Sequence, residues 1–245
     1  MSTLDAARPA AWGTLGALHR LVLRTQLSVT RLLGIAALSG LAIVIGLFAR
    51  YADDPVQAAV DGIASYGLAI LVPLAALWLG TSALGDLIED RLLVYLWLKP
   101  VPRWQLPAAA VLATSVIVVP LTALPLTVST FAASAGELAW PTFLAASLGA
   151  LAYSGLFVLA GLWFRRAVWW GLAFIVIWEN LVANTVPGAA RFTVAGWTGG
   201  VLGLAAEGTD HLDAGSPAVA FVVLPAIAVA GWLLAVWRYR RADVD

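Results

Sequence analysis

The ionisable side chains that could do chemistry gather in one segment of this sequence, residues 85–103. It begins acidic, with Asp86, Glu89 and Asp90, and ends basic. Acids favour the start of a helix and bases its end, so a short helix stopped by Pro100 is predicted. A surface helix of this kind suits docking into a groove of another protein, or it continues a helix along the membrane. The other residues on which this prediction depends are Arg91, Tyr95, Trp97, Lys99 and Arg103.

A second group, Trp178-Glu179-Asn180, lies in an apolar stretch. An ionisable group within a membrane span costs several kcal/mol unless it faces protein or a watery cavity, so Glu179 is a functional candidate, with Trp178 beside it. Three roles stay open: fixing the external segment that follows, gating or facing a substrate, and reaching the membrane interface. Arg50, Arg191 or His211 are its candidate partners.

Several other chemistries are excluded by what the sequence lacks. It has no cysteine, which excludes a thiolate centre, and its two histidines argue against a metal centre. A P-loop needs a Gly-Lys-Ser/Thr sequence, but Lys99 is the sole lysine and Pro100 follows it. Ser154-Gly155 lacks the surroundings of a serine nucleophile. We therefore expect a chain that is not an enzyme and binds no cofactor or metal.

Composition places these residues in a lipid bilayer. Of 245 residues, 62% are hydrophobic and 11% charged, and the mean hydropathy is +0.91, far from soluble domains. The formal net charge of zero gives no argument for nucleic acid. A span needs about 20 apolar residues. An all-α polytopic protein with six transmembrane helices is predicted, over residues 32–49, 66–84, 106–133, 142–164, 167–186 and 217–237.

The orientation follows from the basic residues, since loops rich in arginine and lysine stay in the cytoplasm. They cluster before the first span, between spans 2 and 3 and between spans 4 and 5, and after span 6, whereas Arg50 and Arg191 fall on the other side with most acids. Both termini are therefore expected in the cytoplasm. Arginine far outnumbers lysine, and with abundant alanine and glycine this indicates a GC-rich bacterial genome, hence a bacterial cytoplasmic membrane.

We expect one domain, residues 1–245, with three appended features. Residues 1–31 are cytoplasmic and include an amphipathic helix, predicted over 15–33, with Arg20, Arg24 and Arg31 on one side. It lies on the membrane surface as an anchor, or it also contacts a cytoplasmic partner. Residues 85–105 form the charged loop, and residues 187–216 form an external segment with short surface or re-entrant helices. No cleavable signal peptide is expected, so the first span is retained.

The run Ile88-Glu89-Asp90-Arg91 through Tyr95-Leu96, followed by Lys99-Pro100-Val101-Pro102-Arg103, resembles the loop between spans 2 and 3 of ABC-2-type transporter permeases. The layout of an amphipathic helix, six spans and an external segment before the last span is similar too. Family members of this layout often carry a Trp-Glu pair in span 5. The sequence departs from the family at Leu92, where many members have threonine.

This resemblance implies that residues 85–105 are a coupling helix that inserts into an ABC ATPase. The chain would then be the permease subunit of an ATP-driven exporter for a hydrophobic or amphipathic cargo, such as a drug or lipid. Its partners would be two ATPase subunits, which hold ATP and Mg²⁺, a second permease subunit, identical or different, and membrane lipids. The alternative is an ATPase-independent secondary transporter or a membrane scaffold, although carriers usually place ionisable residues at the bilayer midplane.

Overall fold

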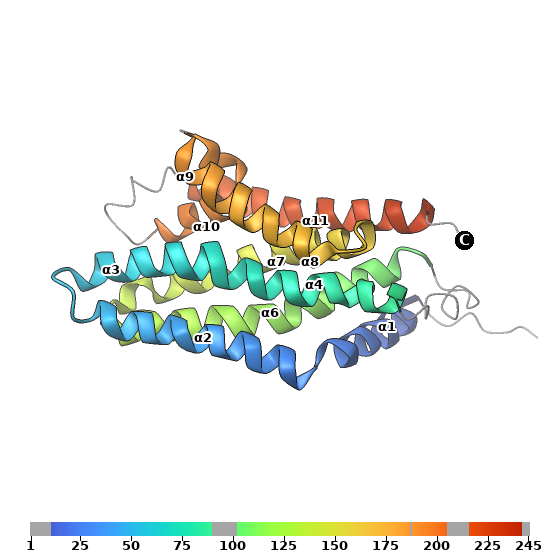
Figure 1. Ribbon diagram of the computed structural model, residues 1–245, viewed down its shortest axis with the longest axis horizontal. Coiled ribbons are helices and arrows are strands. Elements are labelled where there is room, and N and C mark those ends of the chain that lie inside the picture. Colours follow the sequence, from blue (N-terminus) through green and yellow to red (C-terminus); the bar gives the residue numbers. More distant parts are fainter. Residues whose placement is uncertain (1–10, 90–101, 187, 205–215, 242–245) are drawn as a thin grey trace, which may run out of the picture.

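The computed structural model describes residues 11–89, 102–186, 188–204 and 216–241. These residues form helices and connecting turns, with no strand among them, and the long helices lie side by side along one axis (Figure 1). The all-helical prediction is therefore confirmed for this part of the chain. The elements are α1 (Ala11–Gln26), α2 (Val29–Ala49), α3 (Pro55–Gly62), π-helix η1 (Ile63–Leu71), α4 (Val72–Glu89), α6 (Gln105–Ala132), 3₁₀ turn η2 (Gly136–Leu138), α7 (Ala139–Trp163), α8 (Ala167–Ala173), π-helix η3 (Phe174–Val182), α9 (Ala183–Thr185), 3₁₀ turn η4 (Ala189–Phe192), α10 (Val194–Leu202) and α11 (Pro217–Arg241).

Five helices in the described part of the chain are long and apolar enough to cross a membrane: Val29–Ala49, Pro55–Gly85, Gln105–Ala132, Gly136–Trp163 and Pro217–Arg241. They are the helices of a multi-pass membrane protein. Where the sequence predicts a further span over residues 167–186, the apolar helix is the shorter Ala167–Val182. About 20 residues are needed to cross a hydrocarbon core, so length alone does not make this helix a span.

The predicted second span starts earlier than hydropathy indicates. Its helix begins at Pro55 and runs without a break through α3, η1 and α4. The Asp54 carboxylate accepts hydrogen bonds from the amides of Val56 (3.1 Å) and Gln57 (3.0 Å), which is a helix N-cap, and proline suits the first helical position. Hydropathy misses these first turns because they are polar, although their capping residues favour a helix.

The predicted amphipathic helix over 15–33 is divided in two. The helix α1 ends at Gln26, and Val29 already belongs to α2. On α1, Leu18 and Val22 are buried in a cluster with residues of α4 and α6, while Arg20 and Arg24 are exposed. The buried Gln26 amide donates to Thr114 Oγ1 (2.9 Å) and the Leu79 carbonyl (3.3 Å). The apolar side of α1 therefore packs on protein, and Gln26 holds the break against the neighbouring helices.

The helix α7 lies at the centre of the bundle and packs against α4, α6, α10 and α11. Its glycines permit close crossings. A Cβ added to Gly155 would lie 2.6 Å from the Ala228 carbonyl oxygen on α11, and one added to Gly231 would lie 2.6 Å from Gly155. A Cβ on Gly161 would likewise lie 2.6 Å from the Thr81 carbonyl oxygen on α4. Backbones of α7 and its neighbours therefore touch directly, as small residues allow in membrane proteins.

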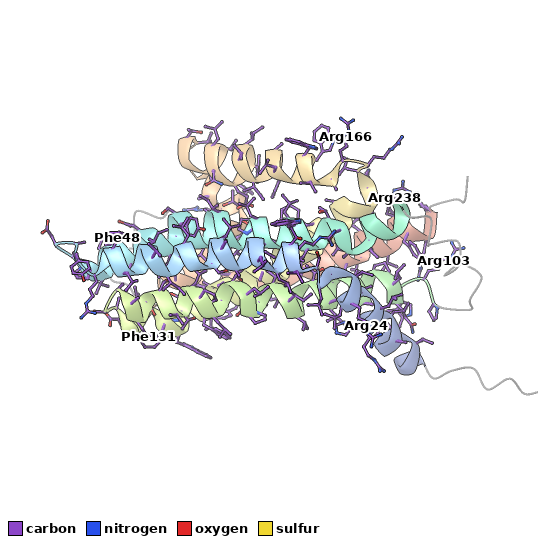
Figure 2. The ribbon with its side chains drawn as sticks, turned by 60° about the horizontal axis from the view of Figure 1, so that its bottom comes forward. Arg24, Phe48, Arg103, Phe131, Arg166 and Arg238 are labelled. Carbon is purple, nitrogen blue, oxygen red and sulfur yellow. The ribbon has the colours of Figure 1, made fainter. Side chains whose placement is uncertain are left out.

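The two ends of the bundle differ in charge. Figure 2 shows Arg24, Arg103, Arg166 and Arg238 toward one end, here called the basic end, and Phe48 and Phe131 toward the other. The acids of the described residues outside α4 and η3 lie at that other end, before or within α3 and η2: Asp53, Asp54, Asp61 and Glu137.

Candidate functional site

Glu179 lies on η3 and is 2% exposed. Its carboxylate accepts three hydrogen bonds, from the Tyr153 hydroxyl (2.8 Å) and from the backbone amides of Val194 (3.0 Å) and Ala195 (2.9 Å). A buried carboxylate is very unfavourable unless such donors replace its water. Here all three donors are neutral groups.

The two amides belong to the first turn of α10, whose first amides have no partner within the helix. Glu179 accepts from the first two of these, and the Thr193 hydroxyl accepts from the third, that of Gly196 (3.0 Å). The positive end of the helix dipole adds a favourable interaction with the carboxylate. Glu179 therefore completes the cap of a helix from a neighbouring part of the chain.

The residues on either side of Glu179 make their own long-range contacts. Trp178 Nε1 donates to the Phe192 carbonyl at 3.3 Å. Asn180 Nδ2 donates to the carbonyls of Ala69 on η1 (3.3 Å) and Ile175 on η3 (2.9 Å). Three consecutive side chains of η3 thus connect it to the rest of the bundle. Trp178 joins it to η4, Glu179 to α7 and α10, and Asn180 to η1. The two π-helical segments meet here, and such wide turns often accompany functional sites.

Tyr153 is the residue of this site that sequence reasoning missed. It is fully buried on α7, and its ring stacks on Phe157 with centroids 5.8 Å apart. The only signal in the sequence is a tyrosine in the middle of a predicted apolar span, where its hydroxyl needs a partner.

Two of the three partners proposed for Glu179, Arg50 and Arg191, do not contact it in the structure. Arg50 and Arg191 are exposed, and Glu179 has no arginine among its hydrogen-bond partners in the described residues. His211 lies outside the described residues. No group of three His, Asp or Glu residues in the described part of the chain could hold a metal ion. The arrangement can fix the segment between α9 and α10 to η3, which is the structural one of the three roles left open.

Of the predicted docking residues, the structure describes Asp86, Glu89 and Arg103, and these lie at the basic end, away from Glu179. Asp86 and Glu89 are near the end of α4. Arg103 is exposed and its Nη1 donates to the Arg240 carbonyl at 2.9 Å, joining the start of α6 to the end of α11. The remaining residues of this prediction lie outside the described residues: Asp90, Arg91, Tyr95, Trp97, Lys99 and Pro100.

Fold and site together define a multi-pass helical membrane protein in which a buried carboxylate joins two segments. No family model matches the sequence, and a search of curated proteins finds no match.

Proposed function

We propose that this chain is the permease subunit of an ATP-driven ABC exporter of the ABC-2 type, which moves a hydrophobic or amphipathic molecule across a bacterial cytoplasmic membrane. The observation that carries the proposal is the charged segment of residues 85–103, which resembles the coupling helix of that family. The ends of α4 and α6 that flank the segment support it, because both lie at the basic end of the bundle. Residues there are available to a cytoplasmic partner if the basic end faces the cytoplasm, as the positive-inside rule predicts.

In this proposal the continuous helical stretch of α8, η3 and α9, residues 167–185, also crosses the membrane and is the fifth of six spans. Together with the five longer helices it brings both termini to the cytoplasmic side. Two such chains, identical or different, form the membrane domain. Two ATPase subunits bind ATP and Mg²⁺ and dock onto residues 85–105.

The proposed mechanism is alternating access. Closure of the ATPase subunits pushes on the segment that begins with Asp86 and Glu89, and α4 carries the displacement into the bundle. Asn180 and Ala69 join η1 to η3 by a hydrogen bond of 3.3 Å, so movement of the second span would also reach the fifth. Glu179 then carries the movement to α10.

Charge reversal in the docking segment tests this function. Glu89→Lys and Arg103→Glu should lower the amount of ATPase that co-purifies in mild detergent, or uncouple ATP hydrolysis from transport, while membrane insertion stays normal. The reason is that both residues would contact the ATPase directly. The measurement is a pull-down of the tagged chain from cells that express its whole operon. Mass spectrometry identifies the proteins in the eluate, and an assay measures whether vanadate inhibits ATP hydrolysis by the eluate.

Glu137→Lys is the matched control for Glu89→Lys, because it makes the same charge change on an exposed residue at the opposite end of the bundle. It should leave ATPase binding unchanged. Normal ATPase binding and coupling in both docking variants would contradict the assignment of the coupling helix. A wild-type eluate without any P-loop protein would favour the carrier or scaffold instead.

A further inference from the structure

A large cavity opens at the basic end, between the end of α4, the turn that joins α7 to α8, and α11. Its volume is about 1140 Å³, and Arg165, Arg166 and Arg238 line it. A neighbouring cavity of about 350 Å³ shares Arg165 and Arg166 and adds Arg31. Among the residues that the structure describes with their side chains, no acidic residue lines either cavity. The site is therefore built for an anion.

The three arginines of the large cavity are available to a ligand. Within the described part of the chain, Arg165, Arg166 and Arg238 take part in no hydrogen bond or ion pair. A guanidinium group presents several donors in a plane, which match the oxygens of a phosphate. Three such groups around one cavity favour a phosphate over a neutral polar ligand.

An apolar groove continues from the basic cavity. Its volume is about 460 Å³, it lies between α7 and the helix formed by α8 and η3, and only apolar residues line it. Trp163, Phe164 and Trp170 line both the groove and the basic cavity, so the two spaces adjoin. A ligand that fills both must have an anionic part and an apolar part.

The tryptophans around this site indicate its depth in the membrane. Trp163, Trp170 and Trp237 are all more than 40% exposed, and the rings of Trp163 and Trp237 lie 6.4 Å apart. Tryptophan side chains gather where the hydrocarbon meets the headgroups. The arginines just beyond them would lie at headgroup level, and the groove would extend into the hydrocarbon.

We propose that these cavities bind an anionic phospholipid, with its phosphate on Arg165, Arg166 and Arg238 and one acyl chain in the groove between α7 and α8–η3. Charge complementarity selects the headgroup, and the apolar groove selects a lipid over a soluble phosphate. Basic pockets between helices on the cytoplasmic side bind anionic headgroups in this way. The site needs neither an ATPase nor a transported cargo, so its failure and the failure of the proposed function are separate outcomes.

Lipid retention tests the proposal. The full-length chain is reconstituted into phosphatidylcholine vesicles with increasing fractions of phosphatidylglycerol, extracted in mild detergent and examined by native mass spectrometry. The wild type should retain phosphatidylglycerol in preference to phosphatidylcholine. The double variant Arg165→Gln/Arg166→Gln should retain it about 10- to 30-fold more weakly, because each basic residue contributes to the attraction. Ala160→Phe should also lower retention, since it fills the groove without changing charge.

The control Arg20→Gln/Arg24→Gln removes the same charge from exposed residues of α1 and should leave retention unchanged. An equal loss in this control would show diffuse attraction to the whole basic end and overturn the proposal. Full retention by the Arg165/Arg166 variant would overturn it too, and Arg238→Gln provides a second test if that variant does not fold. Displacement of the lipid by inorganic phosphate alone would identify a soluble anion as the ligand.

Discussion

A single carboxylate explains how the segment after η3 is held. Glu179 loses its water on burial and regains three hydrogen bonds, two of them from amides 15 and 16 residues further along the chain. The sequence identifies Glu179 by its type, because an acid in an apolar stretch is unusual. It does not identify the partners, since backbone amides have no signature in a sequence. For this reason the sequence suggested Arg50, Arg191 or His211 as the partner, whereas the structure shows the first amides of α10.

Replacing this carboxylate should destabilise the protein. In Glu179→Gln the side chain keeps its size, but in either orientation its NH₂ group would face a backbone N–H, that of Val194 or Ala195, which also donates. Tyr153→Phe removes one donor and leaves the carboxylate buried with two. Each change is expected to cost about 1–3 kcal/mol of folding free energy. Thermal unfolding in detergent measures this, together with the rate of proteolysis between α9 and α11.

Tyr66→Phe is a matched control, because the Tyr66 hydroxyl donates to the neutral Leu38 carbonyl at 2.7 Å. It should lower stability less, by about 0.5–1.5 kcal/mol, and leave proteolysis of that segment unchanged. If Glu179→Gln is as stable as the wild type but changes transport, Glu179 has the gating role.

Among the elements, the crossing of α7 and α11 shows what a sequence pattern conceals. The sequence has no Gly-xxx-Gly pair that predicts this contact. The structure shows the reason: each helix contributes one glycine, Gly155 on α7 and Gly231 on α11, and the two face each other. A pair divided between two helices cannot be found by its spacing. Hydropathy located five long apolar helices, but it did not predict which neighbour each helix face contacts.

Gly231→Ala should therefore separate α7 from α11. Its Cβ would lie 2.6 Å from backbone atoms of Gly155, which cannot rotate away as a side chain can. Overpacking of this kind typically costs about 1–3 kcal/mol. Gly40→Ala on α2 is the control, because a Cβ there meets nothing within 4 Å. Thermal unfolding should show a lower midpoint for Gly231→Ala alone, and equal midpoints for the two variants would contradict the close crossing.

At the scale of the whole molecule, charge and hydropathy predicted more than the motifs did. The helical class and five of the long apolar helices are present in the described residues, and Arg24, Arg103, Arg166 and Arg238 lie toward one end of the bundle, as the clustering of basic residues predicted. These properties sum over many residues, so errors at single positions matter little. The break at Gln26 is held instead by hydrogen bonds to Leu79 and Thr114, which are far away in the sequence, so the sequence did not indicate it.

The absence of cysteine makes the number of spans directly testable. Asp53→Cys, Arg166→Cys and Arg191→Cys introduce single thiols on three connections. With residues 167–185 crossing the bilayer, Asp53→Cys and Arg191→Cys should react with a membrane-impermeant maleimide in intact cells. Arg166→Cys should react only after permeabilisation. If Arg191→Cys and Arg166→Cys react with the maleimide under the same conditions, both lie on the same side of the membrane and the chain has five spans.

The continuous helix that begins at Pro55 has a consequence for the choice of bilayer. Its 31 residues to Gly85 would measure about 46 Å as an α-helix, well beyond a hydrocarbon core of about 30 Å. With the first 8 residues, α3, which carry the exposed Asp61, outside the hydrocarbon core, about 35 Å of helix would have to be matched. A tilt of about 30° accommodates that length and lies within the usual range. A thinner bilayer would require a steeper tilt, which the glycine contacts of α4 with α7 oppose. Hydrophobic mismatch should thus make the stability of this protein depend on lipid chain length.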